Sequence, residues 1–180
     1  MISLNLDNSE RLRPARMPAA RKILVAALLG MTAVALATPP LGFILNQILA
    51  KGVISSNISE NVQITKSTDS PWGAEVQTHG ATDFYVQHLV LAPGGYSGWH
   101  VHPGILIGTL TAGSIDFYNE KCQKRTVGPG EVYFETGTTH GIYNAGSVDA
   151  DLYISYLIKH GAPRRMESDA PACAVTTPIP

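Results

Sequence analysis

Three histidines are the side chains of this sequence best suited to binding a metal ion. His100 and His102 are separated by one residue within a β-prone segment, 93–104, that glycine and proline turn signals bound on both sides. Because side chains alternate along a strand, both imidazoles face the same side and can bind one ion without bending the backbone. Neutral imidazole is a common ligand for Zn, Cu, Fe, Ni and Mn. The pair alone is equally typical of two ordinary surface histidines.

A second segment, 128–144, favours the metal-site interpretation. It contains a Gly-Pro-Gly turn, a short β-prone run, a turn at Gly137 and then a third histidine, His140. His140 follows the first pair by about forty residues. Two acidic residues in this segment, Glu131 and Glu135, lie close to His140 in sequence, and the sequence alone leaves open whether either reaches the metal.

The two segments together resemble the paired motifs of the cupin superfamily. The matching residues are Gly94, His100, His102 and Gly113 in the first motif, and Gly137, His140 and Asn144 in the second. The resemblance covers about residues 84–160 and departs from the family at two positions. Leu106 stands where the family has a glutamate ligand, and Glu135 stands where a proline is usual, in a segment one residue short.

The resemblance implies a single jelly-roll β-barrel in which His100, His102 and His140 converge on a divalent transition metal, which could be Fe, Mn, Zn, Cu or Ni. Leu106 cannot serve as a ligand, so we expect at least one coordination position to stay open to water or a substrate. An open position is typical of a catalytic metal site rather than a structural one. Three-histidine iron centres occur among cupin-like dioxygenases, and Leu106→Glu is expected to restore the family's fourth ligand.

Three functions follow from the resemblance. The first is an exported small cupin that binds a metal and a small-molecule ligand or substrate, with its catalytic step unassigned. The alternatives are a metal-dependent oxidoreductase of the dioxygenase type and a non-catalytic small-ligand-binding module, and the fold does not decide among them. The oligomeric state stays open, a homodimer included.

The rest of the sequence predicts an all-β domain independently of these motifs. Short β-prone runs are separated by Gly, Pro and Asn turns without a helical period, which is typical of a sandwich or barrel. The expected strands are 41–54, 62–64, 83–91, 105–110, 114–118, 125–127, 132–134, 141–143 and 151–158. The strand at 41–54 is a preference over a short helix, because periodicity does not separate the two there. The aromatic residues Trp99, Tyr133, Phe134 and Tyr143 are expected in the barrel core, and His79, His88 and His160 outside the site.

Length and charge limit the organisation and the partners of the chain. Its 180 residues accommodate one ordinary domain with a leader. We expect a leader at 1–37, a barrel at 41–165 and a Pro/Ala-rich tail at 166–180. The leader carries a net charge of +3 and the remainder −4. A mildly acidic domain lacks the basic surface that nucleic acid requires, so that partner class is excluded.

The leader has the features of a signal peptide. An uncharged apolar run of fifteen residues, 23–37, follows Arg21-Lys22 and ends in Ala35-Leu36-Ala37, a small-x-small cleavage pattern. This run is shorter than the ~20 apolar residues that a spanning helix needs. We therefore expect a secreted or periplasmic protein, with translation starting at Met1 or Met17. The alternative is an uncleaved membrane anchor formed by residues 23–49.

The two cysteines, Cys122 and Cys173, predict one intramolecular disulfide. An even cysteine count in a chain with an export leader is typical of a disulfide-bonded protein. The bridge would hold the tail against the barrel.

Overall fold

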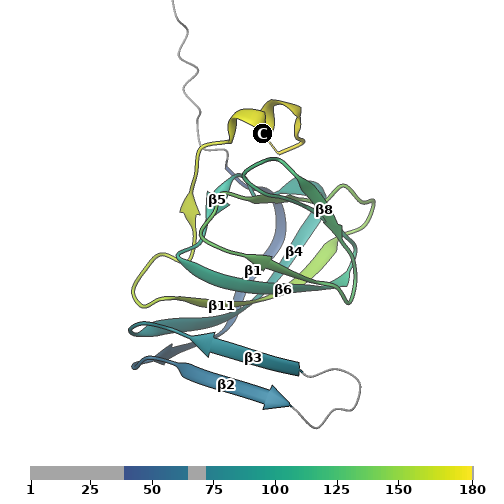
Figure 1. The fold of residues 1–180 in the computed structure, drawn as a ribbon. Helices are drawn as coiled ribbons and strands as arrows, with labels where there is room; N and C mark the ends of the chain where they lie inside the picture. The colour runs from purple at the N-terminus through teal and green to yellow at the C-terminus, as the bar shows by residue number, and fades with distance from the viewer. Residues whose placement is uncertain (1–38, 65–71, 180) are drawn as a thin grey trace, which may run out of the picture. The chain divides into compact units, whose positions relative to one another are not determined.

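The computed structural model describes residues 39–64 and 72–179 (Figure 1). The predicted leader, 1–37, lies outside the described residues, so its cleavage stays a prediction. Within the described ranges, no helix is long and apolar enough to cross a membrane.

The described residues form an all-β fold, as the sequence predicts. The strands are β1 Leu41–Ile54, β2 Ser59–Ile64, β3 Trp72–Gln77, β4 Thr82–Tyr96, β5 His100–Val101, β6 Gly104–Ala112, β7 Ile115–Tyr118, β8 Lys124–Val127, β9 Val132–Glu135, β10 Gly141–Tyr143, β11 Ala150–Lys159 and β12 Met166–Glu167. A short 3-10 helix, η1 Ala172–Thr176, completes the elements. The prediction of a first strand at 41–54 is confirmed to the residue.

One eight-stranded sheet curls into a nearly closed barrel (Figure 1). Its strand order is β8-β7-β10-β4-β11-β6-β9, and β1 pairs with β4 outside this path. The long strand β4 is the centre of the sheet, because β1, β10 and β11 all pair with it in antiparallel register. This pairing explains why 41–54 is a strand: its backbone groups bond along β4 from Tyr96 to Thr82.

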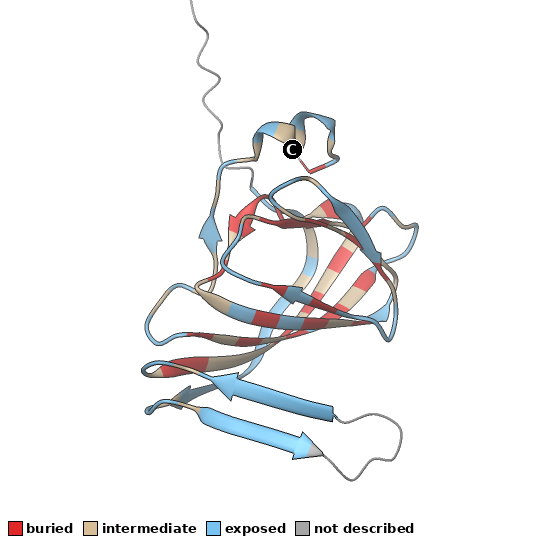
Figure 2. Cartoon of the chain, viewed as in Figure 1, coloured by how far each residue is buried: buried red, intermediate tan, exposed pale blue. Residues whose placement is uncertain are grey.

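Buried and more exposed residues alternate along the strands, so that every second side chain points into the barrel and fills its core (Figure 2). On β6, Leu106, Gly108 and Leu110 face inward, while Ile105 and Ile107 are exposed. The same alternation corrects one expectation. Phe134 is 60% exposed, because its neighbours Tyr133 and Glu135 take the inward positions of β9. Tyr133 lies in the barrel core as expected, whereas Trp99, which is buried, and Tyr143, which is half-buried, pack in a second cluster with Tyr118 and Ile179.

Gly113 shows why the turn between β6 and β7, two strands that do not pair with one another, requires glycine. Its φ is 68°, which lies in the left-handed region that other residues rarely adopt. A Cβ at this position would also collide with the carbonyl oxygen of Asp149 on the neighbouring chain segment.

The C-terminal segment packs on the end of the barrel that carries β5. Strand β12 pairs with β5, so that Met166 lies opposite Val101 and Glu167 opposite His100. Farther along, Ile179 is buried against Trp99 and Tyr118.

A disulfide joins Cys122 to Cys173, 51 residues apart in the sequence. In the chain-entropy account, closing a loop of this length stabilises the fold by about 4 kcal/mol. We call residues 160–173, which lead from the end of β11 to this disulfide, the strap.

The start of the strap is fixed by a buried carboxylate, Asp83, on β4. Its Oδ1 lies 2.8 Å from Nδ1 of His160, and its Oδ2 accepts a hydrogen bond from the backbone N–H of Gly161 at 3.2 Å. The bond to His160 holds the pKa of the Asp83 carboxyl below its ordinary value, although burial opposes the shift. His160 is therefore exposed but paired.

Asp83→Asn should remove a pH-dependent part of the stability. Because the pKa of Asp83 is lower in the folded chain than in the unfolded one, its contribution is present above about pH 4 and is lost as the pH falls through the folded value. Wild type should therefore be more stable than the variant at neutral pH, and the gap should narrow below about pH 4. Urea unfolding from pH 2.5 to 7 measures the difference, and a gap that stays constant across this range would contradict the assignment.

Candidate metal centre

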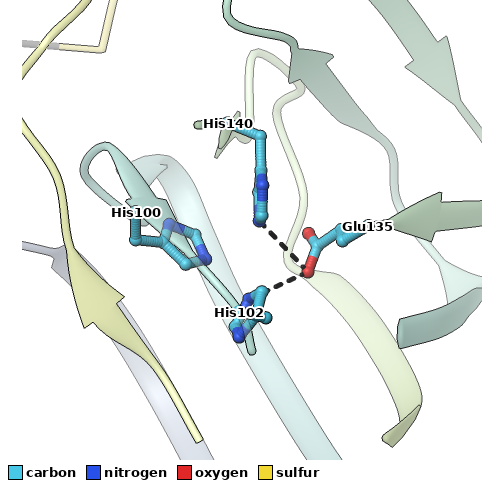
Figure 3. A group of neighbouring side chains, drawn as sticks. All are labelled: His100, His102, Glu135 and His140. Atoms are coloured by element: carbon cyan, nitrogen blue, oxygen red, sulfur yellow. Dashed lines mark ion pairs between the residues drawn. The ribbon is translucent and has the colours of Figure 1, made fainter. Parts of the chain in front are cut away.

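Four buried side chains converge inside the barrel: His100, His102, Glu135 and His140 (Figure 3). Each is 4% exposed or less. One potential ligand atom from each residue lies within 4.8 Å of the others. Three imidazoles and one carboxylate at this spacing could hold a metal ion, and ordinary core packing gives no reason to gather them.

The backbone positions the three histidines on facing chain segments. His100 lies on β5, and His102 follows one residue beyond that strand on the same face, as the His-x-His spacing predicts. His140 stands opposite His100 across an isolated bridge, whose reciprocal backbone hydrogen bonds measure 2.9 and 3.0 Å. The bridge brings the two motif segments into contact, although forty residues separate them.

The Nδ1 atom of every histidine in the cluster is occupied by a backbone carbonyl. The acceptors are Gly98 O for His100 at 3.0 Å, Arg164 O for His102 at 2.6 Å and Thr138 O for His140 at 2.7 Å. A carbonyl oxygen only accepts, so Nδ1 must carry the hydrogen. In the neutral imidazole this leaves the Nε2 lone pair free, which is the arrangement that orients histidine ligands in metal sites.

The carboxylate of Glu135 faces two of these nitrogens. Its Oε2 lies 3.2 Å from Nε2 of His102 and 3.4 Å from Nε2 of His140 (Figure 3). Both Nε2 atoms are buried without a hydrogen-bond partner among the described residues. In the neutral imidazole the Nε2 lone pair and the carboxylate oxygen are both acceptors, so they satisfy one another only if a proton or a metal ion lies between them. The residues present therefore fit a metal ion.

Burial and the charges of neighbouring groups shift the pKa values of these side chains in different directions. Burial holds the pKa of His100 well below its ordinary value, which favours the neutral form that a metal requires. Burial also lowers the pKa of His140, but the carboxylate of Glu135 outweighs it, and the pKa is raised overall. For Glu135 burial raises the pKa, but the positive charge of a protonated His140 and the close contacts of the carboxylate with His102 and His140 lower the pKa by more, so this carboxyl is held in its charged form.

The register of β6 and β9 explains the missing glutamate. Leu106 and Glu135 are directly opposite one another across these strands, and both face inward. The carboxylate therefore reaches the cluster from the neighbouring strand instead of from position 106. Glu131 does not approach it, because it is exposed and accepts a hydrogen bond from Gly128 N at 2.7 Å. The usable signal in the sequence was the glutamate at the position where the family has proline.

The remaining histidines lie away from the cluster. His88 stacks on Tyr153 and lies 2.9 Å from Oδ1 of Asp151, and His79 is exposed. Neither contributes an atom to the candidate metal centre.

A cavity of about 120 Å³ opens beside the cluster. His100, His102 and Glu135 form one part of its lining, and Gln87, Tyr156 and Arg164 form another part. Tyr156 Oη donates a hydrogen bond to Gln87 Oε1, and Arg164 Nη1 donates to the same oxygen at 2.6 Å. We did not identify Gln87, Tyr156 or Arg164 from the sequence, because their proximity depends on pairing between β4 and β11 and on the strap.

Comparison with known proteins gives one family match. Residues 87–157 match the family model described as a cupin domain. No curated protein matches the chain.

Several solved structures are similar over part of the chain. A polyketide cyclase, RemF of Streptomyces resistomycificus, is 21% identical with a TM-score of 0.41, over 49% of this chain and 64% of the cyclase. An oxalate oxidase is 24% identical with a TM-score of 0.38, over 41% of each chain. An uncharacterized double-stranded β-helix protein from Klebsiella pneumoniae is 17% identical with a TM-score of 0.42, over 63% of this chain and 85% of that protein. The chain thus spans less than two thirds of the cyclase and of the oxidase.

Leu106→Glu should destabilise the protein rather than complete the site. The new carboxylate would be buried directly opposite Glu135, and an uncompensated buried charge costs on the order of 3 kcal/mol or more. The double variant Leu106→Glu/Glu135→Leu moves the carboxylate across the strand pair and should recover much of this loss. Urea unfolding in the presence of a chelator compares the variants. A single variant as stable as wild type would show that the two positions do not face one another.

Proposed function

Because this chain is a member of the cupin superfamily, we propose that it binds one divalent transition metal ion through His100, His102, His140 and Glu135. The observation that carries the proposal is the convergence of buried Nε2 lone pairs on a buried carboxylate, because neutral imidazoles with the hydrogen on Nδ1 cannot donate a hydrogen bond to it. We further propose that the open side of the metal faces the adjacent cavity, where a small molecule binds.

Glu135 changes the expected metal preference. Three imidazoles suit Zn, Cu, Fe and Ni, whereas a carboxylate adds the harder oxygen ligand that Mn prefers. Four protein ligands would close a tetrahedral zinc site but would leave two positions open on a six-coordinate Fe or Mn ion. When bound, such an ion would supply Lewis acidity or electron transfer to a ligand in the cavity. The negative charge of Glu135 would offset part of the ion's charge.

The residues around the cavity determine what can approach the metal. Leu89, Ile142 and Ile154 contribute apolar lining that limits water, while Gln87 and Tyr156 present a hydrogen-bonded polar wall. This combination of apolar lining and a few fixed polar groups is typical of a small-molecule site. It favours a ligand-binding metal centre over a purely structural one.

A metal-dependent oxidoreductase of the dioxygenase type is the second candidate. The observation in its favour is that three of the four candidate ligands line the cavity, so a ligand there would be next to the ion. A redox metal near one per chain would support this candidate, whereas zinc would support the non-catalytic binding module.

His102→Ala should abolish stoichiometric metal binding. It removes one of the two unpartnered Nε2 atoms, while His79→Ala, at an exposed position, should leave metal content unchanged. Elemental analysis after dialysis should give about one transition metal per wild-type chain. Metal at 100 times its Kd should raise wild-type stability by about 2.7 kcal/mol, and this gain should disappear in the variant. Acidification should release the metal, because its ligands must be deprotonated. Full metal content in His102→Ala would overturn the proposal.

We also propose that the protein is exported and that the leader is removed after Ala37. The disulfide between Cys122 and Cys173 supports an oxidising compartment. N-terminal sequencing of the mature protein should begin at or near Thr38. Recovery of the full-length chain from membranes would instead support the uncleaved anchor at 23–49.

A further inference from the structure

Arg164 is a cation in the cavity wall that has no anionic partner among the described residues. It lines the cavity, and its guanidinium carbon lies 5.3 Å from the ring centre of Tyr156. Among the described residues, no carboxylate lies within 4.0 Å of its guanidinium. Its hydrogen bonds go instead to two neutral groups, Gln87 Oε1 at 2.6 Å and Tyr156 Oη at 3.4 Å.

The N–H groups of Arg164 that make no hydrogen bond to the described residues lie along one edge of its guanidinium. Both recorded hydrogen bonds come from Nη1, so Nη2 and Nε make none to the described residues. Arginine carries five N–H donors in a planar fork that matches the two oxygens of a carboxylate. The Nε and Nη2 pair is the part of the fork that stays available.

The neighbouring Arg165 already uses the same pair of donors, Nε and Nη2, to bind a carboxylate within the strap. Arg165 Nε donates to Glu167 Oε1 at 2.6 Å and Nη2 donates to Glu167 Oε2 at 2.7 Å. Its charge is thus neutralised within the strap. Of the two adjacent arginines at the cavity, Arg164 is the one without a carboxylate partner in the described part of the chain.

The charge of the loaded site would also favour an anion. Three neutral imidazoles and the Glu135 carboxylate would offset only one unit of a divalent ion's charge, and Arg164 adds another positive charge beside it. In a partly buried cavity, such an excess is costly unless a counter-charge accompanies it. A small anion that reaches both Arg164 and the metal would supply that counter-charge.

The size and lining of the cavity limit the anion. Its volume, about 120 Å³, is somewhat smaller than a cavity of ~150 Å³ that holds benzene, so the enclosed part of a ligand has at most about six non-hydrogen atoms. The apolar side chains Leu89, Ile142 and Ile154 provide contacts for a carbon skeleton, which inorganic phosphate lacks.

We propose that this cavity selects a small carboxylic acid, bound as its carboxylate to Nε and Nη2 of Arg164 with its other end toward the metal. This inference rests on the proposed metal centre and assigns its ligand class. Arg164 also serves the centre through its backbone, because its carbonyl oxygen accepts the Nδ1 hydrogen of His102. A side-chain substitution leaves that carbonyl in place, so metal binding and anion binding can be separated.

Pyruvate, which has six non-hydrogen atoms, is a suitable probe, with pyruvamide as its neutral counterpart and inorganic phosphate as the competing anion. Calorimetric titration of cobalt-loaded wild type should give measurable pyruvate binding, at least tenfold tighter than binding of pyruvamide or phosphate. Arg164→Gln should weaken pyruvate binding at least tenfold while retaining one metal per chain, and Arg164→Lys should lie between the two. Arg125→Gln, at an exposed position of β8, is the matched control and should bind pyruvate as wild type does.

Several results would overturn the assignment of a carboxylate: equal binding of pyruvate and pyruvamide, preference for phosphate, no pyruvate binding to the metal-loaded protein, or undiminished binding in Arg164→Gln. The comparison of acid with amide on wild type needs no variant, so it holds even if Arg164→Gln does not fold. If wild type takes up no metal, the proposed metal centre fails separately. The same titrations on the metal-free protein then decide the role of Arg164, since pyruvate binding that Arg164→Gln abolishes would sustain it and any other result would overturn it.

Discussion

The hydrogen bonds from three imidazole Nδ1 atoms to backbone carbonyls are the constraint on which the rest of the centre depends. They fix the tautomer and ring direction of His100, His102 and His140, so that the lone pairs meet inside the barrel. Each acceptor comes from a different part of the chain: the turn before β5, the turn before β10 and the strap. The barrel, the motif turns and the C-terminal segment must therefore all be in place before the ligands are oriented.

Most of the fold could be predicted from the sequence because its signals are local. Alternating apolar residues and glycine turns located the strands of the barrel, and β7, β9 and β10 lie within one residue of the expected ranges. Two features were less predictable. β4 extends to Tyr96 through Pro93 and two glycines that read as turn residues, because its end pairs with β1 and β10. β12 is too short to carry a pattern, and it exists because β5 offers it a partner.

The candidate site divides in the same way between local and long-range information. The spacing of His100 and His102 determines that they share a face, and the motif resemblance related them to His140. The roles of Glu135 and Arg164 could not be derived from spacing. Glu135 depends on which residue of β9 pairs with Leu106, and a slip of one residue would turn it outward. Arg164 depends on the path of the strap, which Asp83 directs at one end and the disulfide fixes at the other.

The pairing of Leu106 with Glu135 also bears on how candidate metal ligands are recognised when sequences are compared. Two residues that face one another across a strand pair project into the same space, so either can deliver a carboxylate to a common point. Within a lineage, a ligand can change strands through two substitutions while the barrel and its histidines stay unchanged. A search that demands the glutamate at one column of an alignment would classify such a chain as a degenerate, metal-free relative. Comparing residues by their place in the sheet, rather than by their order along the chain, would find Glu135 as a candidate ligand on the neighbouring strand.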